Sequence, residues 1–144
     1  MTNVKRGSAG RVFESRLRVR GYELDGFAHL NHAVYFNYFE TARFDALAEG
    51  GFPLSALAAR GWGIHLVHAE ADFRKEAFLG QEMVVSTEVT AARSSSMTIE
   101  HVASDPAHPD RVFAEGKVVV VWVGADRRPM RIPDEVRAAL GLPQ

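Results

Sequence analysis

The chain has 144 residues, which is enough for one domain whose hydrophobic core needs no disulfide or metal to support it. Its formal net charge is −1, so charge gives no reason to expect a nucleic acid or an anionic membrane as a partner. The absence of cysteine excludes a disulfide framework, a cysteine nucleophile and a thiolate metal site. No signal-peptide pattern appears, and no apolar run reaches the roughly 18 residues of a membrane span, so we expect a cytoplasmic protein.

The first part of the chain predicts a strand and a long helix. Residues 1–10 lack periodicity and are expected to be a flexible tail before a single domain over residues 11–144. Residues 11–20 alternate with a period of two, which predicts a half-buried strand. Residues 33–50 read AVYFNYFETARFDALAEG and are apolar around most of a helix's circumference, so the helix must be buried on most sides.

The faces of this helix are predicted from its period. A narrow polar stripe is formed by Asn37, Thr41, Asp45 and Glu49, and the opposite side by Tyr35, Phe39, Ala42 and Ala46. We expect Gly50 and Gly51 to end the helix, one of them in the left-handed conformation.

The rest of the chain predicts a short helix, four strands and a final short helix. The helices cover residues 52–61 and 132–140, and the strands cover residues 62–73 (running on toward Phe78), 83–91, 95–104 and 111–124, with a turn at 105–110. The run Val118–Val123 predicts a strand buried on both faces. The economical arrangement is an α+β fold in which a five-stranded antiparallel sheet curls around the one long helix.

The stretch before this helix, residues 22–31, contains a candidate site. Asp25 lies in a loop beside Gly26, and Asn31 is a preferred N-cap residue. The helix that begins near His32 directs its unpaired N–H groups and its positive dipole end toward the loop. A carboxylate beside such a terminus suits acyl transfer, which needs a base or nucleophile next to oxyanion donors. A capped helix with a solvated Asp25 explains the same pattern, and spacing alone does not choose between the two.

Two blocks of this sequence resemble the motif of 4-hydroxybenzoyl-CoA thioesterase-like proteins. The blocks are Asp25-x-x-Ala28-His29-Leu30-Asn31 and Val34-Tyr35-x-x-Tyr38-x-Glu40-x-Ala42-Arg43, and fainter matches extend the resemblance from about Val12 to Pro133. These proteins have the hotdog fold, in which an antiparallel sheet wraps a central helix. Ala28 stands where the family usually has Gly, and would cost about 1 kcal/mol if the backbone there needs a positive φ.

The resemblance implies hydrolysis of a fatty or aromatic acyl-CoA to the free acid and CoA. Asp25 matches the family's catalytic carboxylate, acting as nucleophile or as general base, and the backbone N–H near His32 would polarise the thioester carbonyl. The resemblance also implies a homodimer or homotetramer with active sites at the dimer interface. We expect no cofactor and no metal, because the sequence offers no carboxylate–histidine cluster beyond Asp25 and His29.

The remaining candidates each have a structural alternative. For His29 the alternatives are to orient the loop, to contact the acyl group or to transfer a proton. For Asn31 they are to cap the helix or to order a water beside Asp25. For Tyr35 they are a place in the core or in the acyl pocket. Glu40 and Arg43 are spaced to pair on the helix, although some hotdog thioesterases take their carboxylate from it. The cations that meet the CoA phosphates, or else are solvated surface, are Arg74, Lys75 and Arg93.

Two other functions compete with hydrolysis. One is a non-catalytic acyl-CoA-binding hotdog domain, and the other is a hotdog hydratase or dehydratase that uses His29 and Asp25 on an enoyl thioester. The motif context favours hydrolysis. A nucleophilic serine of the α/β-hydrolase type is excluded because the chain has no G-x-S-x-G sequence.

Overall fold

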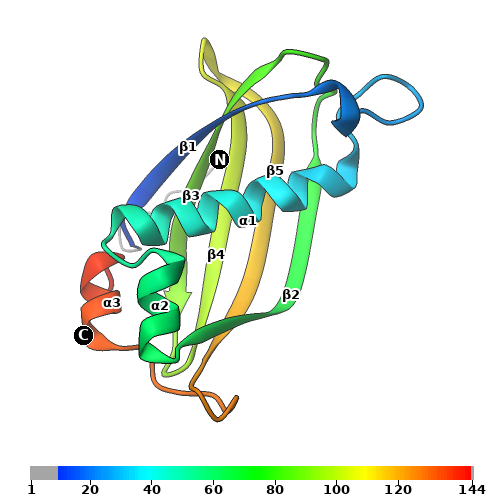
Figure 1. Cartoon of the computed structure of the whole chain (residues 1–144). Helices are drawn as coiled ribbons and strands as arrows, with labels where there is room; N and C mark the ends of the chain where they lie inside the picture. The colour runs from blue at the N-terminus through cyan, green and yellow to red at the C-terminus, as the bar shows by residue number, and fades with distance from the viewer. Residues whose placement is uncertain (1–9, 144) are drawn as a thin grey trace.

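The computed structural model describes residues 10–143 and shows a five-stranded antiparallel sheet curled around one long helix (Figure 1). The elements are β1 (Val12–Arg18), the 3₁₀ turn η2 (Gly21–Glu23), α1 (His32–Glu49), α2 (Leu54–Arg60), β2 (Gly63–Phe73), β3 (Glu82–Ala92), β4 (Ser96–Asp105), β5 (His108–Val123) and α3 (Asp134–Ala139). The predicted fold class is therefore confirmed. Most of the predicted N-terminal tail lies outside the described residues, but Gly10 N–H donates to the Val89 carbonyl at 2.9 Å.

The strand order in the sheet is β1-β3-β4-β5-β2, so β1 and β2 form its two edges. In Figure 1, α1 crosses the concave side of the sheet; α2 and α3 lie at one end of α1, and the loop after η2 lies at the other. Within residues 10–143, no helix combines the length and apolar character needed to cross a lipid bilayer.

The α1 helix forms and ends as its sequence predicts. The Asn31 side chain caps it by accepting from Ala33 N–H at 2.9 Å. After Glu49 the chain turns through Gly51, whose φ of 100° is a conformation that glycine adopts without strain. The predicted polar stripe is exposed and the opposite side is buried, with Phe39 completely covered.

The middle of α1 meets the sheet at Gly116 of β5. A Cβ atom at Gly116 would lie 2.4 Å from the Phe39 ring, so the missing side chain allows the helix to approach the strand closely. Phe39 also stacks on His101 of β4, with ring centroids 4.9 Å apart and planes 2° from parallel. This contact fixes the height of α1 above the sheet.

His101 is a buried neutral imidazole in this contact. Its burial, helped by the nearby Arg43 cation, lowers its pKa to about 3 despite a hydrogen bond to the Ser86 carbonyl. Arg43 Nη1 lies 3.2 Å from Nε2, which must be the acceptor, so the ring proton resides on Nδ1, 3.1 Å from the Ser86 oxygen. The expected close pairing of Glu40 with Arg43 is not made. No ion pair joins them among the described residues, and the Arg43 guanidinium lies against His101, although the charge of Glu40 still raises the pKa of Arg43 against its lowering by burial.

Three local expectations differ from the structure. The turn predicted over residues 105–110 is only Pro106–Ala107, because the Asp105 carboxylate accepts from Ala107 N–H at 2.9 Å and closes the hairpin early. In the run Val118–Val123 every residue on the side facing α1 is buried. On the other side Val119 and Val121 are half-buried and Val123 is buried. β2 ends at Phe73 without continuing to Phe78.

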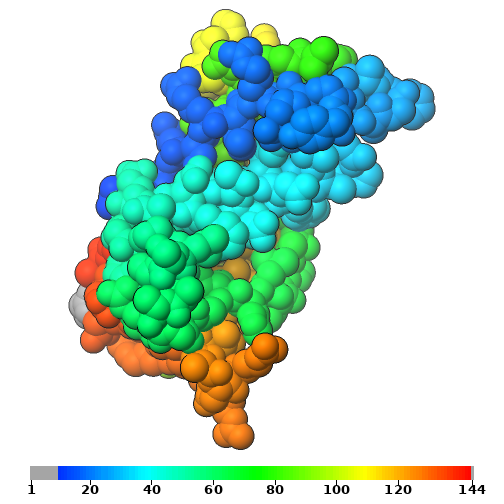
Figure 2. Space-filling model, in the orientation of Figure 1, coloured from blue at the N-terminus to red at the C-terminus, as the bar shows by residue number. Residues whose placement is uncertain are grey.

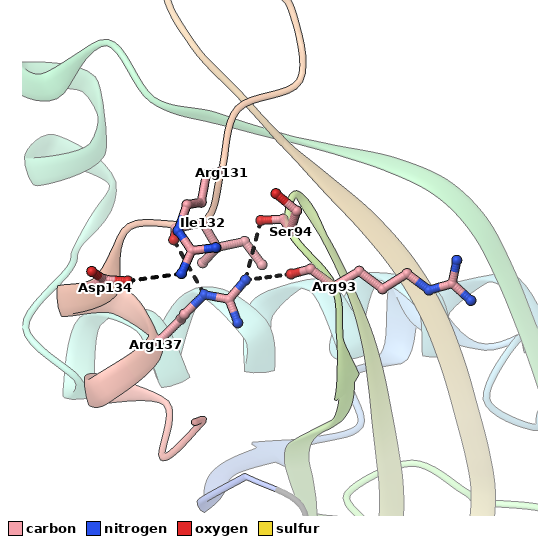
Figure 3. Close-up of polar contacts among 6 residues, drawn as sticks. All are labelled: Arg93, Ser94, Arg131, Ile132, Asp134 and Arg137. Atoms are coloured by element: carbon pink, nitrogen blue, oxygen red, sulfur yellow. Dashed lines mark hydrogen bonds and ion pairs between the residues drawn. The ribbon is translucent and has the colours of Figure 1, made fainter. Parts of the chain in front are cut away.

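The C-terminal helix is fastened to the sheet by one buried arginine (Figure 3). The Arg137 guanidinium donates to the backbone carbonyls of Arg93 and Ser94 in the β3–β4 hairpin, and its Nε lies 3.4 Å from the Ile132 carbonyl. Ile132 N–H returns a hydrogen bond to the Ser94 carbonyl at 2.8 Å. These bonds close the end of the molecule opposite the loop after η2.

Replacing Gly116 by Ala should destabilise the fold, because the added methyl group overlaps the Phe39 ring. We expect a loss of about 1–3 kcal/mol in the free energy of unfolding, measured by urea denaturation. Gly21→Ala is the matched control, since a Cβ there meets only the Leu79 side chain at 4.0 Å. Equal stability of the Gly116→Ala and wild-type proteins would show that this contact does not set the position of α1.

Candidate active site

The loop between η2 and α1 holds the Asp25 carboxylate in one orientation. Asp25 Oδ1 accepts hydrogen bonds from the backbone N–H groups of Phe27 (2.9 Å) and His29 (3.2 Å). Asp25 N–H in turn donates to the His29 carbonyl at 2.8 Å, which closes the loop. The two backbone donors lower the pKa of Asp25, so the group is a carboxylate at neutral pH. Its Oδ2 has no hydrogen-bond partner among residues 10–143 and is available to a reactant.

Ala28 adopts the conformation that the family glycine would provide. Its φ is 65°, in the left-handed region, and its N–H donates to the Asp25 carbonyl at 3.0 Å. The loop therefore keeps its tight path and bears the steric strain of the alanine, about 1 kcal/mol. Strain of this kind persists only where the surrounding hydrogen bonds fix the backbone.

The first turn of α1 presents one free backbone donor. Asn31 accepts from Ala33 N–H through its side chain and from Val34 N–H through its carbonyl. His32 N–H, the first of the helix, donates to no acceptor in the part of the chain that the structure describes. A free N–H at the positive end of a helix dipole is suited to bind a carbonyl oxygen that gains negative charge.

These groups face a shared cavity of about 230 Å³, which we call the site cavity. It lies between the N-terminus of α1 and the segment that follows β2. The structure brings together six of the residues predicted from the sequence: Asp25, His29, His32, Tyr35, Arg74 and Lys75. The Tyr35 hydroxyl is buried without a hydrogen-bond partner, and its burial raises its pKa to about 12.

The other predicted residues lie elsewhere or have other partners. Asn31 is the helix cap, as described above. Arg93 lies in the β3–β4 hairpin, where its carbonyl accepts from Arg137 of α3 (Figure 3), and α3 lies at the end of α1 opposite the loop that holds Asp25 (Figure 1). Arg74 is paired with Glu115 at 2.9 Å.

Sequence patterning missed the wall of the cavity that comes from the segment around the end of β2. Phe73 packs against the Tyr35 ring with centroids 5.6 Å apart, and Glu76 Oε2 lies 3.4 Å from His29 Nδ1. No local motif marks these two residues, because they reach the site only through the pairing of β2 with β5. Among the described residues, no three His, Asp or Glu side chains form a group that could hold a metal ion.

Sequence patterning also missed Glu23, which anchors the loop to α1. Its buried carboxylate accepts from the Tyr38 hydroxyl at 2.6 Å, from Arg20 N–H at 2.9 Å and from the Arg20 guanidinium at 3.0 Å. Its carbonyl accepts from Asn31 N–H at 3.0 Å. Burial alone would raise the pKa of Glu23, but the hydrogen bonds from Tyr38 and Arg20 outweigh it and the pKa is lowered. Glu23 thus holds both ends of the loop that carries Asp25.

Comparison with protein families identifies the group to which this arrangement belongs. The model of the thioesterase-like superfamily matches residues 19–140. The chain belongs to this superfamily. The family and the hotdog fold predicted from the sequence are confirmed, and the predicted class of enzyme, the thioester hydrolases, is the class of the named relatives.

Three proteins illustrate the similarity. Acyl-acyl carrier protein thioesterase ATL3 of Arabidopsis thaliana is 28% identical over 125 residues, which are 87% of this chain and 65% of that protein. Long-chain acyl-CoA thioesterase FadM of Escherichia coli is 26% identical over 89 residues, which are 62% of this chain and 67% of that protein. The crystal structure of a hypothetical protein from Aquifex aeolicus matches with a TM-score of 0.82 at 27% identity, covering 89% of this chain and 98% of that one. The chain therefore spans about two thirds of the length of both named thioesterases.

Replacing Glu23 by Gln should destabilise the protein in a pH-dependent way. The lowered pKa of Glu23 contributes stability that is complete above the ordinary pKa of 4.5 and is lost as the pH falls through the lower value of the folded protein. In Glu23→Gln one carboxylate oxygen becomes an NH₂ group, which cannot accept from Arg20. We expect a loss of about 1–3 kcal/mol at pH 7, shrinking below pH 4.5, from urea denaturation across pH.

The control is Glu82→Gln, which breaks an exposed ion pair with Arg18 and should cost at most about 1 kcal/mol. A Glu23→Gln effect that is no larger than this control, or that does not change with pH, would contradict the anchoring role.

Proposed function

We propose that the protein hydrolyses acyl thioesters at the site cavity, with Asp25 and the N-terminus of α1 as its reactive parts. The observation that carries the proposal is the juxtaposition of an ionised carboxylate, fixed by two backbone donors, with an unpaired helix N–H at His32. A thioester carbonyl bound to His32 N–H becomes more electrophilic, and its oxygen is stabilised as negative charge develops. Membership of the thioesterase-like superfamily supports the same reaction.

Two reaction paths use these groups. In one, Asp25 Oδ2 attacks the carbonyl carbon and the C–S bond breaks, so that a thiolate leaves and takes a proton from water. A water molecule then hydrolyses the mixed anhydride, which releases the acid and restores the Asp25 carboxylate. In the other, Asp25 takes a proton from a water molecule, which attacks the carbonyl carbon directly. Both paths end in a free acid and a thiol. The orientation of Asp25 by Phe27 and His29 serves either path, because it leaves one oxygen free.

The substrate is an acyl group on CoA or on an acyl carrier protein. The two named relatives act on these two carriers, and both carriers present the thioester on a phosphorylated arm. The proposed contacts for the carrier phosphates are Lys75 and Arg74, which line the site cavity. Lys75 has no ion-pair partner among residues 10–143, whereas Arg74 is paired with Glu115 at 2.9 Å and lies 3.9 Å from Asp72. Arg93 can contribute to such contacts only from a second subunit, because it lies beside α3 and does not line the site cavity.

The competing functions make different demands on the same residues. A binding domain without catalysis has no need for a carboxylate held with one oxygen free. A hydratase needs His29 to act on the substrate, but His29 Nδ1 is directed to Glu76 and its ring packs edge-on against Phe78. Hydrolysis is therefore the function that this geometry supports best.

Changing Asp25 to Asn should lower kcat by about 10²–10⁴ for the best acyl-CoA, measured as released thiol. The amide keeps an oxygen acceptor for the Phe27 and His29 N–H groups, so the fold should remain intact. The matched control is Glu40→Gln on the exposed side of α1, which should retain activity. If folded Asp25→Asn protein has activity within tenfold of wild type, Asp25 is not the catalytic carboxylate. If Glu40→Gln protein is inactive, the catalytic carboxylate is Glu40 on the helix.

We further propose that the protein is a homodimer or a homotetramer. β2 is an unpaired edge of the sheet, and its exposed apolar side chains include Leu66 (52% exposed), Val67 (60%) and Phe73 (47%). Exposed apolar edges of this kind are normally covered. Because Phe73 also faces Tyr35, a subunit seated on β2 would border the site cavity.

Multi-angle light scattering at micromolar concentration should therefore give at least twice the mass of one chain. Replacing Val67 by Lys should reduce this mass, since a charge on the edge strand disfavours pairing. A monomeric wild-type protein with full thioesterase activity would contradict the dimer.

A further inference from the structure

Three cavities follow one another along α1. The site cavity lies at His32 and Tyr35. The second, a groove of about 390 Å³, lies beside Phe36, Glu40 and Arg43, and we call it the α1–β2 groove. The third, about 150 Å³, lies beneath the second half of α1 at Ala46 and Leu47, and we call it the inner cavity.

The same order runs backward along β2. Phe73 borders the site cavity, Ala69 and Leu66 border the α1–β2 groove, and Leu66 and Ile64 border the inner cavity. The groove and the inner cavity share Glu40, Arg43 and Leu66. Figure 2 shows the hollow between α1 and β2, with part of β5 visible at its floor. The cavities thus form a sequence from the candidate catalytic groups to the core.

The inner cavity is apolar over most of its wall. Buried side chains from four strands line it, among them Phe13, Val89, Met97, Ile99 and Val120. Protein cores are normally packed without voids of this size, and apolar cavities of about this volume stay dry and bind small hydrocarbons. The polar wall residues are Glu40, Arg43 and Thr87, and Arg43 is turned toward His101. A hydrocarbon chain can pass the methylene groups of Arg43 while the guanidinium keeps that hydrogen bond.

From these observations we infer that the acyl group of the substrate is an unbranched aliphatic chain, which lies in the α1–β2 groove and ends in the inner cavity. The inference rests on the proposed function, since it places the thioester carbonyl at His32. The helix rise puts Glu40 about 12 Å and Leu47 about 22 Å from His32 along α1, which corresponds to acyl chains of roughly ten to sixteen carbons. An aromatic acyl group would fill the site cavity and leave the inner cavity empty.

The first measurement is the chain-length dependence of the wild-type enzyme. With acyl-CoA substrates, kcat/KM should rise at least about tenfold from hexanoyl-CoA to tetradecanoyl-CoA, because each added methylene buries apolar area. A preference for hexanoyl-CoA or benzoyl-CoA over tetradecanoyl-CoA would overturn the inference while leaving thioester hydrolysis intact.

The second measurement blocks the path at two points. Leu66→Trp fills the junction of the two cavities, and Ile99→Phe fills the inner cavity. Each should lower the ratio of kcat/KM for tetradecanoyl-CoA to that for hexanoyl-CoA at least about tenfold. The hexanoyl-CoA value reports whether the variant is folded. Leu54→Trp is the matched control, since it makes the same substitution at an exposed residue of α2 that lines none of the three cavities. Unchanged ratios in both blocking variants would overturn the inference and place the chain outside this path, for example between subunits.

A binding measurement separates the inference from the proposed function. Alkyl-CoA thioethers cannot be hydrolysed, and calorimetric titration with them should show affinity rising up to about fourfold per buried methylene. If the protein hydrolyses no acyl-CoA but binds longer thioethers more tightly, the proposed function fails and the chain site stands. If affinity does not depend on chain length, the chain site fails whatever the enzyme hydrolyses.

Discussion

The structure depends on the close approach of α1 to the sheet at Phe39. This side chain is completely buried between Gly116 of β5 and His101 of β4. No other residue than glycine at position 116 leaves room for the ring at this distance. Because the contact lies in the middle of α1, it fixes the helix at one point over the sheet. One end of the helix then lies beside α2 and α3, and the other lies beside the loop after η2. The buried neutral His101, with its proton on Nδ1, follows from the same contact.

The N-terminus of α1 lies beside a loop that is held rigid by its own hydrogen bonds. Asp25 holds two backbone N–H groups, Glu23 ties the loop to Tyr38, and Asn31 caps the first turn. Within residues 10–143, the capping pattern leaves one N–H of this turn, that of His32, without an acceptor. The strained Ala28 shows that this loop is fixed by its hydrogen bonds strongly enough to hold a side chain in the left-handed region. A site of this kind is organised before substrate binds, which is what electrostatic stabilisation of an oxyanion requires.

Along its length, α1 packs against β1 and β3 more closely than against β2. The side of the sheet toward β2 is consequently hollow, and it is also the side whose edge strand exposes Leu66, Val67 and Phe73. The same departure from tight packing thus gives the chain a groove next to the candidate site and an exposed apolar edge strand. Both features lie on one side of the helix, where β2 runs from the inner cavity to the site.

Local patterns in the sequence were enough to predict the helices, the strands and the loop that holds the candidate residue Asp25. The period of residues 33–50, the cap at Asn31 and the glycines after Glu49 are local signals, and local physics sets helix limits and faces. The alternation in the strands, together with one helix too apolar to be exposed, was enough to predict the sheet wrapped around α1. Asp25 and His32 could be named because the loop and the helix terminus are adjacent in the chain.

Contacts between distant segments could not be predicted from the sequence. Strand pairing brings Phe73 and Glu76 to Tyr35 and His29, and it carries Arg93 to the opposite end of the molecule. Arg43 was predicted to pair with its helical neighbour Glu40, but burial places it against His101, where an uncharged acceptor is already fixed. Glu23 and the inner cavity were not predicted, because the partners of a buried carboxylate and the size of a void depend on how side chains from several elements meet. Periodicity gives the face of each element, whereas these distances are set by the height and angle at which α1 crosses the sheet.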